Sequence, residues 1–191
     1  MSDAGPVADP VAALIARDAI QQLYQRYARA ADRLDRTEME RLYHPGALED
    51  HGFYVGPAAG FIDRHFDMAA AQGVTHHLIA PALIEIDGDF AAAEAYFLVY
   101  QRGSGADGAH QDELFGGRYV DRLERRAGEW RFTYRRLVLD YSRAEPSRPW
   151  LTDELRAQLR VIEGRRDASD EIYSRHSKTR PSTDERTSHA G

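Results

Sequence analysis

Residues 114–141 read LFGGRYVDRLERRAGEWRFTYRRLVLDY, and this stretch decides the fold. Aromatic and β-branched residues are frequent in two runs within it, residues 114–125 and 130–141. Between the runs, Ala127-Gly128-Glu129 has the composition of a tight turn. The pattern predicts two long antiparallel strands that pair as a hairpin.

Two upstream runs, residues 75–86 and 91–101, have the same composition. The turn residues Asp87-Gly88-Asp89 separate them, and a stretch rich in Gly and Ser, residues 103–108, leads into the next run. We therefore expect four consecutive strands joined as antiparallel hairpins.

Helical patterns precede these strands. Between residues 11 and 31, apolar side chains recur at steps of three and four, which indicates an amphipathic helix with one buried face. A capping box from Thr37 to Glu40 predicts a short second helix that continues through His44 and ends at Pro45-Gly46.

Residues 47–55 have a strand-like composition, and Gly56-Pro57 breaks this strand. The proline also suits the first position of a third helix, which we expect to end at about residue 71. Helices and hairpins are thus segregated along the chain, which is typical of an α+β fold and not of a doubly wound sheet.

The composition limits the classes of function. With 191 residues, of which 42% are apolar, the chain is long enough for one domain with a substantial core. The formal net charge is −6 and no run of Lys and Arg forms a basic patch, so we expect no nucleic-acid partner. Cysteine is absent, which excludes disulfides, thiolate nucleophiles and thiolate metal sites. No apolar run approaches the roughly 20 residues that cross a membrane, so we expect a cytoplasmic protein without a membrane partner.

The ends of the chain differ from its centre. Residues 1–10 are mostly small and acidic, and we expect a disordered lead. Pro146 and Pro149 mark a boundary, and residues 144–173 are expected to form an extension with one helix over residues 151–162. Residues 174–191 are polar, so we expect a disordered tail without chemistry. The central domain is then residues 11–143.

Several strings occur in the order found in SnoaL-like proteins of the nuclear-transport-factor-2-like superfamily. They are Ala19-Ile20-Gln21-Gln22-Leu23-Tyr24, Tyr43-His44-Pro45, Val55-Gly56-Pro57, Gly117-Arg118-Tyr119-Val120-Asp121-Arg122 and Gly128-Glu129-Trp130-Arg131-Phe132. The resemblance covers residues 12–143. It implies a cone-shaped, curled antiparallel sheet packed against about three N-terminal helices, with one enclosed pocket.

Within this superfamily, the chain resembles the lyases typified by scytalone dehydratase, bile-acid 7-alpha-dehydratase and gamma-hexachlorocyclohexane dehydrochlorinase. Those enzymes use a His–Asp pair without a metal or an organic cofactor. The resemblance implies that Asp32 and His77 form this pair, that Tyr27 corresponds to a tyrosine of the bile-acid enzyme, and that Arg135 corresponds to an arginine of the dehydrochlorinase. No position matches the second catalytic histidine of the scytalone enzyme.

Two neighbours compete for these positions. His76 and His77 must face opposite sides of a strand, so one of them can enter the pocket, and the spacing from His77 to Glu85 favours His77. Arg136 competes with Arg135, since one β-bulge would exchange their faces.

The implied residues suit an elimination reaction. Histidine titrates near neutrality, so His77 can accept or donate a proton, and a buried Asp32 would fix its tautomer. Tyr27 can donate a hydrogen bond to a leaving hydroxyl or an oxyanion, and Arg135 can neutralise negative charge. Five residues at 100° each place Tyr27 and Asp32 about 140° apart on an ideal helix, so we expect Asp32 where the first helix frays.

Two other uses of these residues remain open. Asp32 could instead cap the helix or pair with one of three nearby arginines, Arg29, Arg33 and Arg36. Histidines could bind a metal, and six are candidates: His44, His51, His65, His76, His77 and His110. Because no His-x-His, His-Glu-x-x-His or facial-triad spacing occurs, we expect no metal and no cofactor.

These inferences lead to a prediction of function. We expect a cofactor-independent lyase that eliminates water, or a small aldehyde such as formaldehyde, from a small hydrophobic, aromatic or polycyclic substrate, and that forms a homo-oligomer, dimer or trimer. Three alternatives are an isomerase like the ketosteroid enzymes, the non-catalytic small subunit of a ring-hydroxylating dioxygenase, and a binding protein without turnover.

Overall fold

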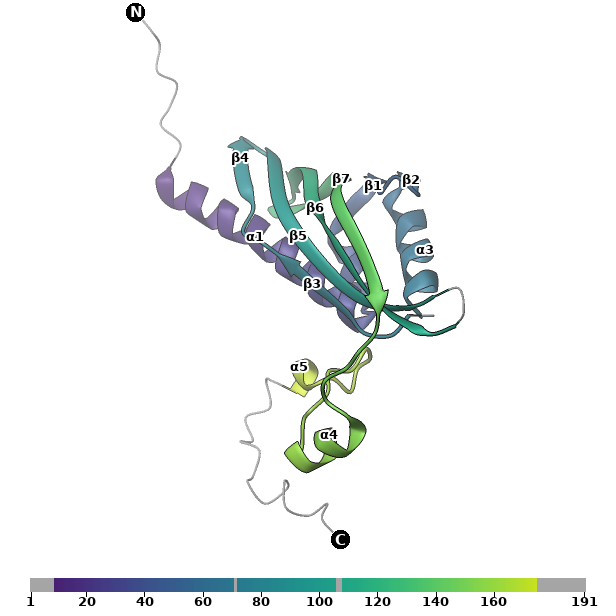
Figure 1. The fold of residues 1–191 in the computed structure, drawn as a ribbon. Helices are drawn as coiled ribbons and strands as arrows, with labels where there is room; N and C mark the ends of the chain where they lie inside the picture. Colours follow the sequence, from purple (N-terminus) through teal and green to yellow (C-terminus); the bar gives the residue numbers. More distant parts are fainter. Residues whose placement is uncertain (1–8, 71, 106–107, 175–191) are drawn as a thin grey trace, which may run out of the picture.

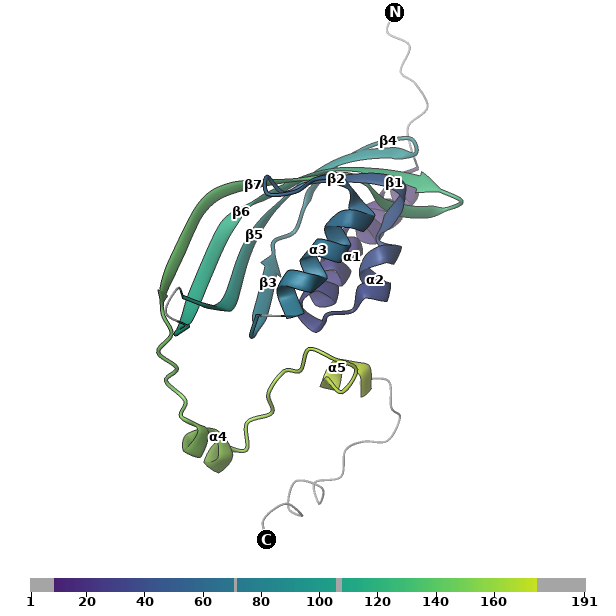
Figure 2. The ribbon, with the colours of Figure 1, turned by 90° about the vertical axis from the view of Figure 1, so that its right-hand side faces the viewer.

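The computed structural model describes residues 9–70, 72–105 and 108–174. In this part of the chain, a strongly curled, unclosed sheet holds three helices against its concave face, which confirms the expected α+β architecture (Figures 1 and 2). The helices are α1 (Pro10–Arg33), α2 (Arg36–Arg41) and α3 (Ala58–Ala70). The strands are β1 (Tyr43–Asp50), β2 (Val55–Pro57), β3 (Thr75–Ile79), β4 (Leu83–Asp87), β5 (Phe90–Ser104), β6 (His110–Arg126) and β7 (Glu129–Pro146).

The order of the strands is β2-β1-β7-β6-β5-β3, and β4 pairs separately with β5. All pairs are antiparallel except β1 with β7, which is parallel. The expectation of a wholly antiparallel sheet was therefore wrong at this pair.

Helix α1 begins and ends with clear capping signals. The Asp9 side chain accepts a hydrogen bond from the Val11 backbone N–H, Pro10 occupies the first turn, and Leu34 closes the helix in the left-handed conformation. Asp32 therefore lies inside the last turn, and the expectation that the helix frays there was wrong. The buried face of α1 consists of Ala16, Ile20, Leu23, Tyr24, Tyr27, Ala30, Ala31 and Asp32.

The second helix starts earlier and ends earlier than predicted. Its N-cap is Asp35, whose side chain accepts the Glu38 N–H, and not Thr37. The helix ends at Arg41, and the predicted helical residues Tyr43 and His44 begin β1. Pairing of Tyr43 with Phe132 of β7 requires extended backbone here, so a tertiary contact overrides the local capping signal.

The predicted strand over residues 75–86 is two strands. Pro81 cannot donate to a ladder and separates β3 from β4, although both pair with β5. The Gln21 side chain on α1 bonds the Ala82 carbonyl at 2.8 Å and the Ala82 N–H at 3.0 Å. This residue of α1 therefore takes the place of a strand partner.

Two adjacent glycines account for the curl of the long strands. The register of β6 against β7 shifts between Gly116 and Gly117, as in a β-bulge. A Cβ on Gly117 would lie 2.2 Å from the Val138 carbonyl oxygen, so no larger residue fits. Figure 2 shows that strands β5 to β7 bend strongly along their length, with the helices on the concave side.

The C-terminal extension lies apart from the sheet, below the ends of α1 and α3 (Figure 2). It contains α4 (Asp153–Leu159), shorter than the predicted helix, and a second short helix α5 (Glu171–Ser174). At the other end, Asp9 and Pro10 belong to the start of α1 rather than to a lead. Ser174, the first residue of the predicted tail, belongs to α5, so this boundary was wrong by one residue. The rest of the predicted lead and tail falls on residues 1–8 and 175–191, outside the described residues. Among the described helices, none is long and apolar enough to cross a membrane.

Candidate active site

A cavity of about 530 Å³ lies between α3 and the concave face of the sheet. Its walls are mainly apolar and aromatic, and its polar groups are three histidines, two tyrosines, two glutamines and a threonine. The lining side chains include Tyr27, His51, Phe53, Phe61, His65, Met68, Gln72, Thr75, His77, Phe97, Val99, Gln101, Phe115, Tyr119, Leu137 and Leu139. Three of these, Phe53, Met68 and Leu139, are about half exposed and mark the mouth.

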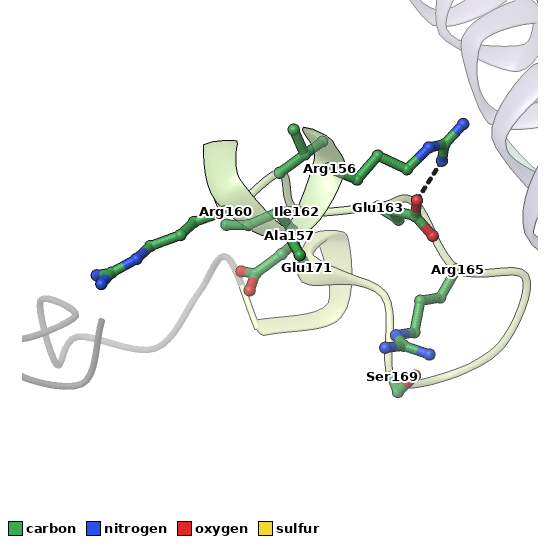
Figure 3. A pocket seen from close by; sticks show the side chains of 9 residues that line it. Arg156, Ala157, Arg160, Ile162, Glu163, Arg165, Ser169 and Glu171 are labelled. Atoms are coloured by element: carbon green, nitrogen blue, oxygen red, sulfur yellow. Dashed lines mark hydrogen bonds and ion pairs between the residues drawn. The ribbon is translucent and has the colours of Figure 1, made fainter. Parts of the chain in front are cut away.

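Two other hollows lack this convergence of chemical groups. One, of about 480 Å³, lies within the C-terminal extension, where Figure 3 shows charged side chains that point in different directions and the ion pair of Arg156 with Glu163. The other, of about 640 Å³, lies at the β4, β5 and β6 ends and contains no histidine. We therefore take the cavity beneath α3 as the candidate active site.

Asp32 and His77 meet at the wall of this cavity. The Nδ1 atom of His77 lies 2.7 Å from Asp32 Oδ1, and the His77 backbone N–H donates to Asp32 Oδ2 at 2.9 Å. Both side chains are 10% exposed. Because an ionised Asp32 can only accept, Nδ1 carries the proton and Nε2 is left with its lone pair. His76 is exposed on the other face of β3.

The arginines that compete for Asp32 are paired elsewhere. Arg29 contacts Glu38, Arg33 contacts Asp170, and Arg36 contacts Asp63. The side-chain partner of Asp32 is thus a histidine of β3 rather than one of these three arginines.

Tyr27 is buried between the histidine and the sheet. Its ring meets the His77 ring edge-on at a centroid distance of 6.4 Å and the Tyr119 ring at 5.7 Å. Burial raises the pKa of Tyr27 well above its usual value, and nearby Arg135 opposes this shift. Tyr27 therefore stays protonated and can donate a hydrogen bond.

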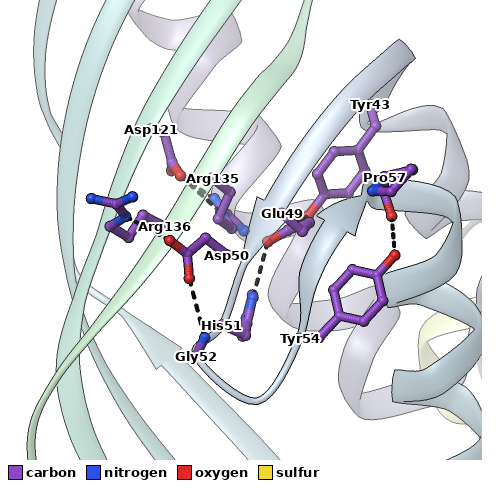
Figure 4. A network of polar contacts seen from close by, with 10 residues as sticks. All are labelled: Tyr43, Glu49, Asp50, His51, Gly52, Tyr54, Pro57, Asp121, Arg135 and Arg136. Carbon is purple, nitrogen blue, oxygen red and sulfur yellow. Dashed lines mark hydrogen bonds and ion pairs between the residues drawn. The ribbon is translucent and has the colours of Figure 1, made fainter.

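Arg135 does not line the cavity. It is fully buried behind Tyr27 and Tyr119, with its guanidinium 4.3 Å from each ring centroid. Nε and Nη2 bond the two oxygens of Asp121 at 2.9 and 2.8 Å (Figure 4). Arg136 faces the opposite side of β7 and pairs with Asp50. The sequence thus selected the inward-facing arginine, but its immediate partners are a carboxylate and aromatic rings.

Two histidines that the sequence analysis considered only as metal ligands also line the cavity. His51 follows β1, stacks on Phe61 at 4.1 Å, and places Nδ1 2.9 Å from Glu49 Oε2 (Figure 4). Glu49 and His51 are two residues apart at a strand end, a spacing that puts both side chains on one face and could have revealed the pair.

His65 lies on α3, and both His77 and His51 act on its pKa. Burial is the largest cause that lowers the pKa of His65 to about 4, and nearby His77 and His51 contribute to the same shift. The His65 ring is therefore neutral near pH 7. Among the described residues, no group of three or more His, Asp or Glu side chains is arranged to hold a metal ion.

Comparisons with known proteins agree with this fold. The profile of the SnoaL-like domain matches residues 12–136. No curated protein matches the sequence. Hexachlorocyclohexane dehydrochlorinase LinA-type3 from Novosphingobium barchaimii LL02 is similar, with a TM-score of 0.66 and 19% identity over 75% of this chain and 99% of that chain.

Two structures from Novosphingobium aromaticivorans are also similar. One is provisionally described as a scytalone dehydratase, with a TM-score of 0.64 and 16% identity over 73% of this chain and 94% of that chain. The other is the beta subunit of a provisionally assigned aromatic-ring-hydroxylating dioxygenase, with a TM-score of 0.54 and 24% identity over 68% and 92%. At these identities the likeness establishes the fold alone.

Proposed function

The chain belongs to the SnoaL-like domain family, and from this premise we propose that it is a metal-independent lyase that eliminates water, or a small aldehyde such as formaldehyde, from a hydrophobic aromatic or polycyclic substrate. The observation that carries the proposal is the pair of hydrogen bonds between Asp32 and His77. Both carboxylate oxygens bind the histidine, so the ring is fixed with Nε2 available to an apolar cavity.

In the proposed reaction, His77 Nε2 takes a proton from a carbon beside an activating group. The electron pair of the broken C–H bond forms a double bond, and the bond from the neighbouring carbon to oxygen breaks with its electrons on oxygen. Asp32 stabilises the imidazolium that forms, because its carboxylate is already in contact with Nδ1. For aldehyde release, His77 Nε2 takes the proton from a hydroxyl on the departing carbon instead. The O–H electron pair forms the C=O bond of the aldehyde, and the electron pair of the broken C–C bond moves into the activating group, which afterwards takes up the proton.

Tyr27 and Arg135 have different tasks in this proposal. Tyr27 lines the cavity and stays protonated, so it donates a hydrogen bond to negative charge on the substrate. Arg135 lies behind Tyr27 and Tyr119 and acts through them, as a positioning residue that fixes both rings.

The walls of the cavity indicate the class of substrate. Phe61, Phe97, Phe115 and Leu137 supply apolar surface, whereas the titratable groups gather around His77 and His51. A volume of about 530 Å³ is in the range of pockets for small organic ligands. A substrate with one or two aromatic rings would contact the apolar walls, and its polar reacting centre would face the titratable groups.

A turnover screen tests the proposal. Hydroxylated aromatic, diaryl and steroid-like compounds are incubated with the protein without added cofactor, and products are analysed by mass spectrometry. Loss of water or formaldehyde that persists with a chelator supports the lyase. A product of unchanged mass would identify an isomerase instead. Absence of turnover, together with co-purification of a larger iron-containing protein, would favour the non-catalytic subunit.

A further inference from the structure

The cavity contains a second histidine–carboxylate pair, Glu49 with His51, besides Asp32 with His77. The two pairs come from strands far apart in the sheet order, because β1 lies near one end and β3 at the other. The curl of the sheet brings both histidines into one cavity. Each of them lowers the pKa of His65, so both lie within electrostatic reach of that ring.

The carboxylate of Glu49 is buried and is fixed by a hydrogen bond. It is fully buried, and the Tyr43 hydroxyl donates to its Oε1 atom. The other oxygen, Oε2, lies 2.9 Å from His51 Nδ1, but the two atoms are not aligned as a hydrogen bond, and neither has another hydrogen-bond partner among the described residues. Burying a carboxylate is costly unless charge or hydrogen bonds compensate, and the His51 ring, within 2.9 Å of Oε2, is placed to provide this compensation.

The His51 ring is fixed from several sides. It stacks on Phe61 with its ring plane inclined by 22°, and its backbone N–H donates to the Tyr54 carbonyl at 2.9 Å. Nδ1 faces Glu49, while the ring lines the cavity. His51 thus resembles His77 in having a carboxylate behind the ring and substrate space in front of it, although the contact of His77 is an aligned hydrogen bond and that of His51 is not.

We propose that His51 is a second catalytic residue, which donates a proton to the leaving oxygen while His77 removes the proton from carbon. This inference rests on the proposed lyase function. The proton from carbon goes to His77 Nε2, the C–H electron pair becomes the double bond, and the C–O electron pair stays on oxygen. The proton from His51 converts that oxygen to water, and exchange with solvent resets both rings.

The second histidine determines which leaving group the site favours. Hydroxide is a poor leaving group and needs a proton as the C–O bond breaks, whereas chloride leaves without one. A site with a dedicated proton donor therefore fits hydroxylated substrates rather than halogenated ones. The inferred substrate class is a β-hydroxy carbonyl compound with an aromatic ring.

Two matched probes test this assignment: the β-hydroxy ketone formed from acetophenone and benzaldehyde, and its β-chloro analogue. Both give chalcone, which is followed by its ultraviolet absorbance after subtraction of the uncatalysed rate. We expect His51→Gln to lower kcat for the hydroxy ketone by about 10²–10⁴ and for the chloro ketone by less than about tenfold. Glu49→Gln, which can still accept from Tyr43, should show the same selectivity if His51→Gln does not fold.

His77→Gln is the reference, because it should lower kcat for both probes. If His51→Gln lowers both rates equally, or neither, then His51 is not the proton donor and the Glu49 pair is structural. If the wild-type protein converts neither probe, or His77→Gln leaves both rates unchanged, then the lyase function is wrong and the role of His51 is wrong with it.

Discussion

Asp32 binds His77 twice, with Oδ1 2.7 Å from the ring Nδ1 and Oδ2 accepting the backbone N–H of the same residue at 2.9 Å. The second bond joins the last turn of α1 to β3 whatever the chemical state of the ring. Removal of the imidazole therefore leaves the contact between helix and strand in place. The two parts of this contact, one structural and one chemical, are separable by substitution.

We expect His77→Gln to lower kcat for elimination by about 10²–10⁴ with little change in Tm, because the backbone bond to Asp32 survives. Asp32→Asn should cost a comparable factor, since it favours the wrong tautomer, and the double variant should be little worse than either single one. Steady-state kinetics and thermal unfolding check this. The matched control is His76→Gln, an exposed neighbour on the same strand.

A different outcome would reassign Asp32. If Asp32→Asn loses stability but keeps full turnover per folded molecule, then Asp32 acts only as a link between α1 and β3.

Substitution of the two adjacent arginines of β7 should lower stability by very different amounts. Arg135 and Asp121 form a fully buried pair, so Arg135→Met alone leaves an uncompensated carboxylate and should cost about 3–5 kcal/mol of unfolding free energy. Arg136→Met removes an exposed pair with Asp50 and should cost less than about 1 kcal/mol. Chemical denaturation measures both.

Measurement of kcat and KM distinguishes a role of Arg135 in positioning the tyrosine rings from a role in stability alone. A second variant, Arg135→Lys, keeps a cation beside Asp121 but not the planar fork over the tyrosine rings. We expect it to fold and to show a lower kcat at an unchanged KM for the β-hydroxy ketone. Wild-type kinetics in this variant would contradict a positioning role for Arg135.

Strong local patterns predicted most of the fold. The apolar periodicity of residues 11–31 gave α1, and turn residues placed the hairpins because both signals are local. The start of β1 at Tyr43 could not be predicted, since it depends on pairing with Phe132, which lies far along the chain. The inward face of Arg135 depended on register shifts between β6 and β7 that no spacing reveals.

The candidate site was predictable in part. Asp32 and His77 were named through the resemblance to known lyases, and the structure places them in contact. The pair of Glu49 and His51 was within reach of sequence reasoning, because both residues fall in the predicted strand 47–55 and side chains two residues apart on a strand share one face.

His65 should make the protein sensitive to mild acid. Its pKa is lowered to about 4 in the fold from 6.5, so the folded state resists protonation. The stability from neutral His65 is fully present above about pH 6.5 and is lost as pH falls toward 4, because the unfolded chain then binds the proton more tightly. The loss should reach at most about 3 kcal/mol.

Urea unfolding at a series of pH values measures this sensitivity, and His65→Gln is the test variant. The groups that act on the ring are His77, His51 and Arg166, which lower its pKa, and Asp32, which raises it. We expect the variant to lose less stability than the wild type between pH 6.5 and 4. An unchanged pH profile in the variant would mean that another group carries the acid sensitivity.

The last prediction concerns Arg166, through which the C-terminal extension reaches the site. Its Nη1 donates to the carbonyls of Ala69 at 3.0 Å and Gln72 at 2.9 Å, and also to that of Gly73, so it caps the end of α3. These residues precede β3, which carries His77. Arg166→Ala should therefore lower Tm and weaken turnover, because both α3 and the approach to β3 lose an anchor.

Truncated chains show which part of the C-terminal extension is responsible for the loss of stability. A chain ending at Ser174 should keep the wild-type Tm, because residues 175–191 are polar and lack the apolar periodicity needed to pack. A chain ending at Leu159 removes Arg166 and also Asp170, the partner of Arg33, and should lose at least as much stability as Arg166→Ala. If the chain ending at Leu159 instead matches the wild type in Tm and turnover, then the contacts of Arg166 contribute nothing, and α3 is held by its packing against the sheet alone.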